Sequence, residues 1–396
     1  MNKFINESKR TFTLDKTLIG LLLAMAIISV SAIYLAGPLI NTADARDVLI
    51  KQVVWYVIGF TAVFILIKFG TDRLFTISYL LYWILMFFLA LLVLARMGII
   101  NTQFIQPISG SYAWFQIPKF GSFQPSEFMK IVLVIISADI IHKHNEEKES
   151  YSFESDFQLI FKMAKYVLPA LVLIVLQPDT GIPIIILFSL ATMFFLSGVR
   201  REWFIIIFTI SSVLFLGIVF LYYNNEALLD KIIGGDYRIN RFYGWLDYEK
   251  YSDTDGYQLY QSLLSYGTAG LSGHDLKSVV VYYPEAQTDF IFAVIAQNWG
   301  FIGGTLVIIL AIALDIKLVL ITLKSSLSRE RYLMMGVVGM MMFQHLQNIG
   351  MIMGLLPITG ITLPFISYGG SSLLSYMIPI SVALFMSSET ENEHKH

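Results

Sequence analysis

Long runs of apolar residues, separated by short polar segments, extend over almost the whole chain. Most runs are long enough to cross the hydrocarbon core of a bilayer as a helix, which takes about 20 residues. The pattern predicts an all-α, polytopic integral membrane protein with about ten transmembrane helices. The predicted spans are Thr17–Leu35, Val53–Phe69, Phe75–Ala95, Pro125–Ile141, Tyr166–Leu176, Gly181–Gly198, Trp203–Tyr223, Phe290–Leu314, Tyr332–Gly354 and Phe365–Met386.

The apolar pattern is interrupted between the fifth and sixth spans. The fifth span is short, and the sequence QPDTG follows it at positions 177–181. This sequence suits a tight turn between two spans, and it also suits a broken helix that lines a polar cavity, where irregular backbone is tolerated in a membrane. The segment 143–165, rich in Glu, Ser and Lys, is interpreted as a solvated connector.

Composition agrees with the pattern. The chain is 56% hydrophobic and 14% charged, whereas a soluble domain has about 25% charged residues. The net charge of −2 does not favour a nucleic-acid partner, and the absence of cysteine excludes disulfides. The polar segment before the first span has no cleavage-site pattern, so that span is interpreted as a retained helix and not as a signal peptide.

The distribution of Lys and Arg predicts the orientation of the chain. Segments on one side of the predicted bundle carry most of these residues, whereas the short segments on the other side carry little beyond Arg46 and Lys119. Since positive residues gather in cytoplasmic segments, we expect a multi-pass protein with both termini in the cytoplasm.

Three segments on the predicted outer side are long or unusual in composition. They are residues 96–124 (the first loop), 224–289 (the second loop) and 354–372 (the third loop). Function often concentrates in loops that a rigid scaffold holds, so their location on one side predicts a site there. Residues 1–396 are interpreted as one transmembrane domain, with the second loop as a large extracytoplasmic loop within it.

Two opposite charges lie at the start of the fourth predicted span. Pro125 suits the first turn of a helix, with Gln124 or Ser126 as the cap, and Glu127 and Lys130 then share a helical face. A charge in hydrocarbon is costly, so the pair is expected to face the bundle interior or a wet cavity. Either the two charges only fix packing by neutralising each other, or they belong to a site.

The second loop ends with Asp289, directly before the eighth predicted span. The helix dipole favours an ionised carboxylate there, and a positioned carboxylate can act as a general base. Alternatively, Asp289 only caps the helix, as Asp often does before an apolar run. Asp179, between the fifth and sixth spans, is either a second site residue or an ordinary turn residue.

The third loop is dense in Gly, Pro, Ser and Thr, and it includes Ser367 and Gly369. Small residues allow close approach of the backbone, and exposed amides bind anions, although helix packing through small residues explains the composition equally well. The chain has no Walker loop, no dinucleotide fingerprint and no zinc-binding spacing, and its six His form no HExxH motif. The pattern therefore does not favour a bound metal.

Four motifs in these segments together resemble the SEDS family (shape, elongation, division, sporulation), over nearly the whole chain. They are QPSEFMK at 124–130, GYQ at 256–258 with QS at 261–262, PEAQTDFIFA at 284–293, and LPFISYGGS at 363–371. Within the family, WF at 114–115 and WLD at 245–247 favour the RodA branch over the FtsW branch.

The resemblance implies a peptidoglycan glycosyltransferase of the bacterial cytoplasmic membrane, which polymerises lipid II for cell elongation and shape. Lipid II is a disaccharide-pentapeptide carried on undecaprenyl pyrophosphate. Asp289 matches the family's essential loop aspartate and is the expected catalytic base. The residues expected to bind substrate are Trp114, Glu127, Lys130, Asp179, Arg238, Arg241, Ser367 and Gly369.

The resemblance also implies protein partners: a class B penicillin-binding protein, which supplies the transpeptidase, and other membrane proteins of the elongation complex. The expected reaction needs one base, because pyrophosphate leaves as an anion, together with a cation that stabilises it. Lys130, Arg238, Arg241 or a Mg²⁺ ion could provide that positive charge. No other cofactor is expected.

The chain departs from the family pattern at several positions. Ala113 stands where an Arg usually precedes the tryptophan, Gln297 and Asn298 replace an acidic pair, and Thr180 follows Asp179. These differences leave open which cation meets the pyrophosphate. Two other functions also stay open: a lipid II flippase, which charges inside the membrane would suit, and a non-catalytic scaffold for wall synthesis.

Overall fold

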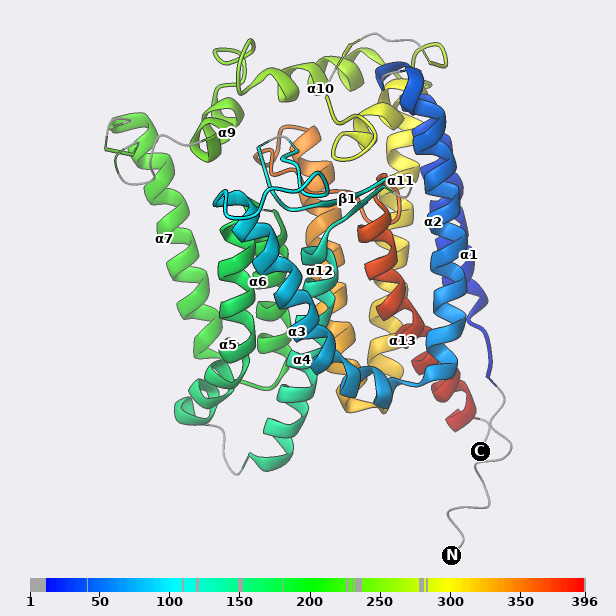
Figure 1. The fold of residues 1–396 in the computed structure, drawn as a ribbon, viewed down its shortest axis with the longest axis vertical. Coiled ribbons are helices and arrows are strands. Elements are labelled where there is room, and N and C mark those ends of the chain that lie inside the picture. The colour runs from blue at the N-terminus through cyan, green and yellow to red at the C-terminus, as the bar shows by residue number, and fades with distance from the viewer. Residues whose placement is uncertain are drawn as a thin grey trace, which may run out of the picture.

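The computed structural model describes residues 12–40, 42–108, 110–118, 121–148, 152–179, 181–225, 228–229, 231, 237–277, 281–282 and 284–394. Within these residues, ten long helices form a bundle (Figure 1). They are α1 (Lys16–Ala36), α2 (Thr42–Phe69), α3 (Thr71–Arg96), α4 (Pro125–Glu147), α5 (Phe153–Val175), α6 (Gly181–Leu196), α7 (Glu202–Asn224), α11 (Ile291–Lys324), α12 (Ser328–Ile352) and α13 (Gly370–His394).

The two ends of the bundle differ in what they carry. The upper end in Figure 1 carries the first, second and third loops, and we call it the loop end. The lower end carries the start of α1 and the end of α13, and we call it the terminal end.

Seven helices of the described chain are long and apolar enough to cross a membrane. They are α1 with its short extension η2 (Gly37–Leu39), α2, α3, α5, α7, α11 and α13. The helix α6 is apolar but shorter, and α4 and α12 include charged residues along their length. The predicted fold class, an all-α polytopic membrane protein with about ten transmembrane helices, is confirmed.

The helices α4 and α12 lie at the centre of the bundle. All residues from 129 to 141 of α4 are buried, because α3, α5, α6, α12 and α13 surround this helix. Likewise, α12 packs against α4, α6, α11 and α13. The buried faces of these two helices are covered by protein, which is how they accommodate polar and charged side chains inside the bundle.

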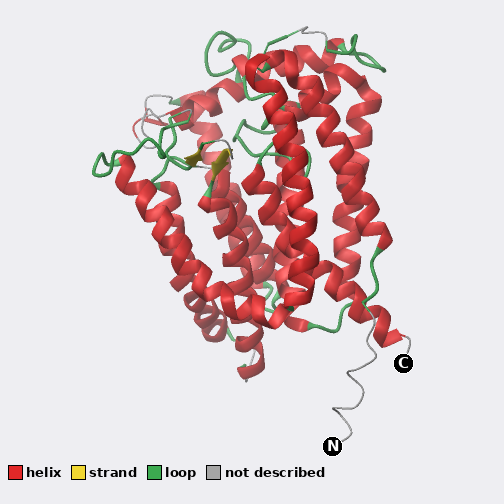
Figure 2. Cartoon of the chain, turned by 45° about the vertical axis from the view of Figure 1, so that its right-hand side comes forward, coloured by secondary structure: helices red, strands yellow, loops and turns green. Residues whose placement is uncertain are grey.

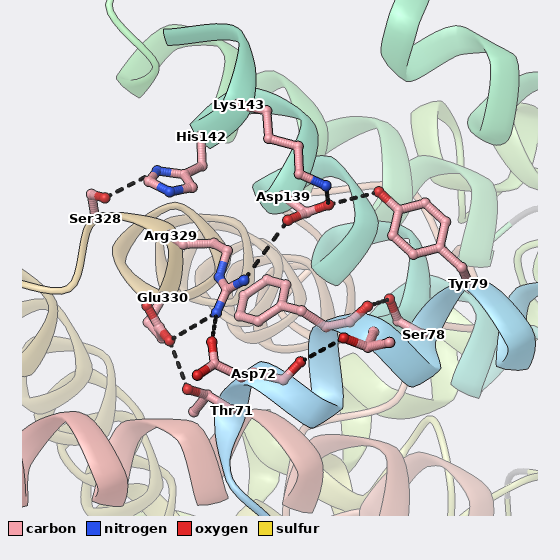
Figure 3. A network of polar contacts seen from close by, with 12 residues as sticks. Thr71, Asp72, Ser78, Tyr79, Asp139, His142, Lys143, Ser328, Arg329 and Glu330 are labelled. Carbon is pink, nitrogen blue, oxygen red and sulfur yellow. Dashed lines mark hydrogen bonds and ion pairs between the residues drawn. The ribbon is translucent and has the colours of Figure 1, made fainter. Parts of the chain in front are cut away.

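At the terminal end, a network of charged side chains joins α3, α4 and α12 (Figure 3). Arg329 of α12 pairs with Asp72 of α3 and lies 3.9 Å from the carboxylate of Asp139 of α4. Asp139 also accepts a hydrogen bond from the Tyr79 hydroxyl at 2.8 Å and pairs with Lys143 at 2.6 Å. These contacts between neighbouring helices fix the terminal ends of α3, α4 and α12 relative to one another.

The loop end contains the remaining secondary structure. The first loop forms a small antiparallel hairpin, β1 (Phe115–Ile117) and β2 (Gly121–Phe123), near the loop end of the bundle (Figure 2). Phe88 of α3 contacts the rings of both Phe115 and Phe123 and so holds the hairpin on the bundle. The second loop contains α9 (Tyr237–Leu246) and α10 (Tyr257–Thr268).

The prediction of a solvated connector at 143–165 is wrong. The helix α4 continues to Glu147 and α5 begins at Phe153, which leaves only a short connection. Ser152 caps α5 by accepting a hydrogen bond from the backbone N–H of Ser155 at 3.1 Å. The segment is helical because one of its faces, with Asp156, Leu159 and Met163, is buried against the bundle, a periodicity that its polar composition concealed.

Two other predicted boundaries are also wrong. The helix α2 begins at Thr42 and not at Val53, and its polar first turns include an ion pair between Asp47 and Lys51 at 2.6 Å. The helix α13 begins at Gly370 and not at Phe365, because residue 365 has a φ of +59°, which no right-handed helix contains. Hydropathy identifies apolar residues, whereas hydrogen bonding at the polar ends decides the bounds.

Candidate active site at the loop end

The start of α4 carries a buried pair of opposite charges. Pro125 is the first helical residue and Gln124 is at the N-cap position, as predicted, although the Gln124 side chain does not bond to the backbone of α4. The carboxylate Oε2 of Glu127 and the ammonium Nζ of Lys130 are 2.5 Å apart. The side chain of Lys130 is fully buried and that of Glu127 is 7% exposed, so each charge depends on the other for its stability in the interior.

Asp179 brings a second carboxylate to this pair. It lies in the connection between α5 and α6, so QPDTG joins two separate spans. Its Oδ1 accepts a hydrogen bond from the backbone N–H of Ile182 at 3.3 Å and caps α6. Its Oδ2 accepts hydrogen bonds from Gln124 Nε2 at 3.0 Å and Ser126 Oγ at 3.4 Å. Burial raises the pKa of Asp179 to about 6, so it is mostly ionised at neutral pH and the three donors stabilise that form.

Lys130 also faces an aromatic ring. Its Nζ lies 4.2 Å from the centre of the Tyr376 ring of α13, which is a cation–π contact. Glu127 and Asp179 both act electrostatically on Lys130. We call Glu127, Lys130, Asp179 and Tyr376 the charged cluster. It places one buried ammonium, a strong hydrogen-bond donor to anions, under the loop end.

Asp289 lies in a turn, residues 284–290, that leads into α11. Phe290 is at the N-cap position of α11 and makes no side-chain capping hydrogen bond, so Asp289 lies one residue before the N-cap position. The turn closes on itself, with the backbone N–H groups of Thr288 and Phe290 donating to the Glu285 carbonyl at 3.1 and 3.2 Å. This leaves Asp289 half-buried near the N-terminus of α11, where the dipole favours its ionised form.

Contacts from elsewhere in the protein hold this turn. The Ser367 hydroxyl of the third loop donates to the Thr288 carbonyl at 2.6 Å, and the Tyr368 backbone N–H donates to the Gln287 carbonyl at 2.8 Å. Asn348 of α12 donates through Nδ2 to the Asp289 carbonyl at 2.8 Å. Three consecutive residues before α11 are therefore hydrogen-bonded to the third loop or to α12.

The third loop is itself fixed by polar side chains of α1 and α2, which bond to the consecutive carbonyls of residues 365–367. Tyr56 donates to the first, Ser29 to the second at 2.7 Å, and Gln52 Nε2 to the third at 3.3 Å. The positive φ of Phe365 is a strained conformation that costs about 1–3 kcal/mol. The hydrogen bonds offset this strain and hold the loop in one conformation.

The third loop also reaches the charged cluster. A Cβ added at Gly181, at the start of α6, would lie 3.2 Å from the side chain of Ile361, so the loop packs directly beside the turn of Asp179. At its other end, the Ser371 hydroxyl accepts a hydrogen bond from the Gln124 backbone N–H at 3.0 Å. The third loop thus contacts both the turn of Asp289 and the surroundings of Lys130, which places them in one region.

The remaining predicted site residues differ in how far the structure places them. Trp114 is half-buried directly before β1. The backbone N–H of Gly369 donates to Gln52 Oε1 at 3.5 Å. Arg238 and Arg241 fall within the bounds of α9, and their side chains lie outside the part of the chain that the structure describes.

The carboxylates of the charged cluster do not form a magnesium site as they stand. Asp179 accepts hydrogen bonds from protein donors through both oxygens, and Glu127 pairs with Lys130. Among the described residues, no three His, Cys, Asp or Glu side chains gather as a metal-binding group. Because Mg²⁺ prefers one or two available carboxylates, we derive no step through this ion.

Comparison with known proteins identifies the family. A family model described as "Cell cycle protein", which groups FtsW, RodA and SpoVE, matches residues 12–392 of the chain. The chain belongs to the FtsW/RodA/SpoVE family. The resemblance to the SEDS family, which is the same group, is therefore confirmed.

Two relatives within the FtsW/RodA/SpoVE family match most of the chain. Stage V sporulation protein E of Bacillus subtilis is 32% identical over 340 residues, which cover 85% of this chain and 86% of that protein. The probable peptidoglycan glycosyltransferase FtsW of Coxiella burnetii is 34% identical over 293 residues, which cover 72% of this chain and 73% of that protein.

Solved structures of the family have the same fold. A chain from a peptidoglycan synthase complex, described as coordinating polymerisation and crosslinking, superimposes with a TM-score of 0.74 at 25% identity and covers 96% of this chain and 99% of its own length. The rod shape determining protein RodA of Thermus thermophilus superimposes with a TM-score of 0.63 at 24% identity, covering 95% of this chain and 97% of that protein. Which branch of the family this chain represents stays a prediction.

Sequence reasoning missed the residues that hold the site together. They are polar residues that lie inside apolar runs or close to their ends: Ser29, Gln52, Tyr56, Asn348 and Tyr376. A polar side chain at membrane depth is costly without a partner, so its presence in a span is itself a signal. That signal was available in the sequence, but the partners of each residue were not.

Proposed function

We propose that this protein is a peptidoglycan glycosyltransferase that polymerises lipid II into glycan strands at its loop end. The observation that supports this most is how Asp289 is held: hydrogen bonds from the third loop and α12 fix its turn beside the N-terminus of α11. A carboxylate in a fixed position, where a helix dipole favours its ionised form, suits a general base.

In the proposed reaction, Asp289 accepts the proton of the 4-hydroxyl of the acceptor sugar. The oxygen of this hydroxyl forms a bond to the anomeric carbon of the donor sugar, and the bond from that carbon to undecaprenyl pyrophosphate breaks. The configuration at the anomeric carbon is inverted. A glycosidase needs a second carboxyl group to protonate its leaving alkoxide, whereas pyrophosphate leaves as an anion, so one base and a stabilising cation suffice.

Lys130 is the cation that we assign to the pyrophosphate. An ammonium shielded from water attracts an anion more strongly than a surface lysine does. Glu127, at 2.5 Å, offsets part of the cost of burying the Lys130 ammonium, and Asp179 holds the start of α6 beside it. Arg238 and Arg241 of α9 are the further cations proposed for the pyrophosphate, and Trp114 is proposed to contact the sugars.

A groove on the side of the bundle supports the proposal of a lipid-linked substrate. It has a volume of about 620 Å³, lies between α1 and α2, and has an apolar lining that includes Ala26, Val30, Val53, Tyr56 and Phe60. Tyr56 connects the groove to the site, because its hydroxyl donates to the Phe365 carbonyl of the third loop. We propose that the undecaprenyl tail lies in this groove while the pyrophosphate and sugars lie at the loop end.

The relatives support a setting for this activity. The matching chain from a peptidoglycan synthase complex suggests that this protein works with a crosslinking partner, and we propose a class B penicillin-binding protein. The bias of Lys and Arg toward segments at the terminal end supports an orientation in the bacterial cytoplasmic membrane with that end in the cytoplasm. We propose a role in cell elongation, together with membrane proteins of the elongation complex.

The experiment that tests the function is polymerisation of labelled lipid II by the purified protein with its penicillin-binding partner, whose transpeptidase is blocked. We expect glycan strands from the wild type and none from a folded Asp289→Ala variant. Asp275→Ala is the matched control, since Asp275 is an exposed carboxylate of the same loop.

Strands from Asp289→Ala at the wild-type rate would refute the assignment of the base. If neither the wild type nor any variant makes glycan strands, in a preparation that moves lipid II across vesicle membranes, the result would instead support the flippase function.

A further inference from the structure

We infer that Asn348 is the positioning residue for Asp289: its side-chain amide holds the backbone of the base and thereby directs the carboxylate. This inference rests on the proposed role of Asp289. Asn348 itself is not assigned contact with the substrate, so it is not a catalytic residue.

The amide of Asn348 makes two short hydrogen bonds from one nitrogen. Its Nδ2 donates to the Asp289 carbonyl at 2.8 Å and to the Ile361 carbonyl at 2.7 Å. The side chain is fully buried. Because both contacts are carbonyl oxygens, only the amino group of the amide can face them, so the geometry fixes the orientation of the amide. Asn348 thereby joins the turn of Asp289 to the third loop.

The first backbone hydrogen bonds of α11 form at the Phe290 carbonyl, one residue after Asp289. The backbone N–H groups of Ala293 and Val294 both donate to Phe290, at 2.9 and 3.2 Å, and not to Asp289. Asn348 bonds the carbonyl directly before this turn and so joins the start of α11 to α12. Without the Asn348 amide, the peptide group after Asp289 loses a hydrogen bond from a buried donor and is held less firmly.

The position of Asn348 makes it an effective anchor. It lies on α12, which packs against α4, α6, α11 and α13 and is one of the two central helices. The third loop is held over residues 365–367 by hydrogen bonds and by the burial of Phe365 and Ile366. Phe365 has a strained backbone conformation. The contact from Asn348 reaches the Asp289 residue itself, and it comes from one of the two central helices of the bundle.

Gln347 provides a matched comparison at the next position of the same helix. Its Nε2 donates to the Pro357 carbonyl at 2.8 Å, and its side chain is 6% exposed. It has the same chemistry as Asn348, similar burial and a bond to the same loop, but that bond goes to the Pro357 carbonyl and not to the turn 284–290. A substitution at Gln347 therefore measures the effect of losing a hydrogen bond to the third loop while the hydrogen bond from Asn348 to Asp289 stays in place.

The experiment compares Asn348→Asp with Gln347→Glu, both of which keep the shape of the side chain and remove its donors. In Asn348→Asp, an oxygen replaces the amino group that faces two carbonyl oxygens, so the turn must move. A misplacement of about 1 Å in a catalytic group lowers the rate about 100-fold. We expect kcat for lipid II polymerisation to fall by about 100-fold, with KM within about twofold of the wild type, and Gln347→Glu to keep kcat within about threefold.

Hydrogen exchange gives a readout that does not depend on activity. We expect faster exchange of the backbone amides of residues 284–290 in Asn348→Asp than in the wild type, and no such change in Gln347→Glu. Asn348→Ala, which removes the donors without adding repulsion, is measured in parallel, so the conclusion does not depend on the folding of a single variant. Asp289→Ala is assayed in the same series.

The outcomes separate the two hypotheses. Unchanged kcat in both Asn348 variants would overturn the positioning role. So would a loss of kcat and an increase in amide exchange in Gln347→Glu as large as those in Asn348→Asp. In either case an inactive Asp289→Ala would leave the assignment of the base in place. An active Asp289→Ala would instead overturn the proposed base itself. A loss of kcat with unchanged KM and faster exchange at 284–290, confined to Asn348, would support the inference.

Discussion

The buried pair of Glu127 and Lys130 allows a structural role to be separated from a role at the site. Lys130→Met removes the ammonium but keeps the length and apolar character of the side chain. It leaves the carboxylate of Glu127, 7% exposed, without the cation that lies 2.5 Å away, and it removes the cation that Asp179 also faces. Removing one partner of a buried pair costs about 3–5 kcal/mol of stability.

The double variant Glu127→Gln, Lys130→Met removes both charges. Replacing a whole buried pair with uncharged groups is often nearly neutral, because the desolvation cost of both charges disappears with their attraction. We expect it to recover most of the lost stability, so that the double variant costs much less than the sum of the two single variants in the double-mutant cycle. The measurement is denaturant unfolding in detergent micelles of the wild type, both single variants and the double variant.

Polymerisation of labelled lipid II by the same four proteins then separates the two roles. If Lys130 meets the pyrophosphate, the double variant regains stability but stays inactive, because the cation is still absent. If the pair only fixes packing, activity returns together with stability. Recovery of the wild-type rate in the double variant would refute our assignment of Lys130 to the substrate.

Two further predictions concern buried charges elsewhere. His345→Leu should destabilise the protein by about 3–5 kcal/mol, because it leaves Asp315, 2.9 Å away and 10% exposed, without its partner inside the bundle. Thermal unfolding measures this loss. A loss below about 1 kcal/mol would show that water already compensates the charge of Asp315. Arg329→Leu should lower the free energy of unfolding by about 1–3 kcal/mol, because it removes a partner of Asp139 in the network of Figure 3. Lys162→Ala, which breaks an exposed ion pair, should leave the free energy of unfolding within about 0.5 kcal/mol of the wild type. Equal effects of the last two substitutions would contradict a structural role for that network.

The sequence by itself determined the class of the protein and the approximate position of its helices. Apolar runs of about 20 residues report the requirement that a segment in lipid satisfies its own backbone hydrogen bonds, which is a local property of the chain. Motifs in the loops were local in the same sense, so the family was recognisable from Gln124 to Lys130 and around Asp289. Helix ends were less predictable, as α5 shows, because side-chain caps and burial of polar turns decide them.

Only the tertiary structure decided which residues act together. Lys130 lies on α4 and Asp179 in the connection between α5 and α6, and their proximity depends on how α4, α6 and α13 pack. The turn of Asp289 is held by hydrogen bonds from the third loop and from Asn348, which are distant from it in sequence. The physical reason is that a polar side chain inside a membrane protein is costly unless it is hydrogen-bonded or paired. The sequence shows that such a side chain is present, but only the packing of the helices decides which group it bonds to.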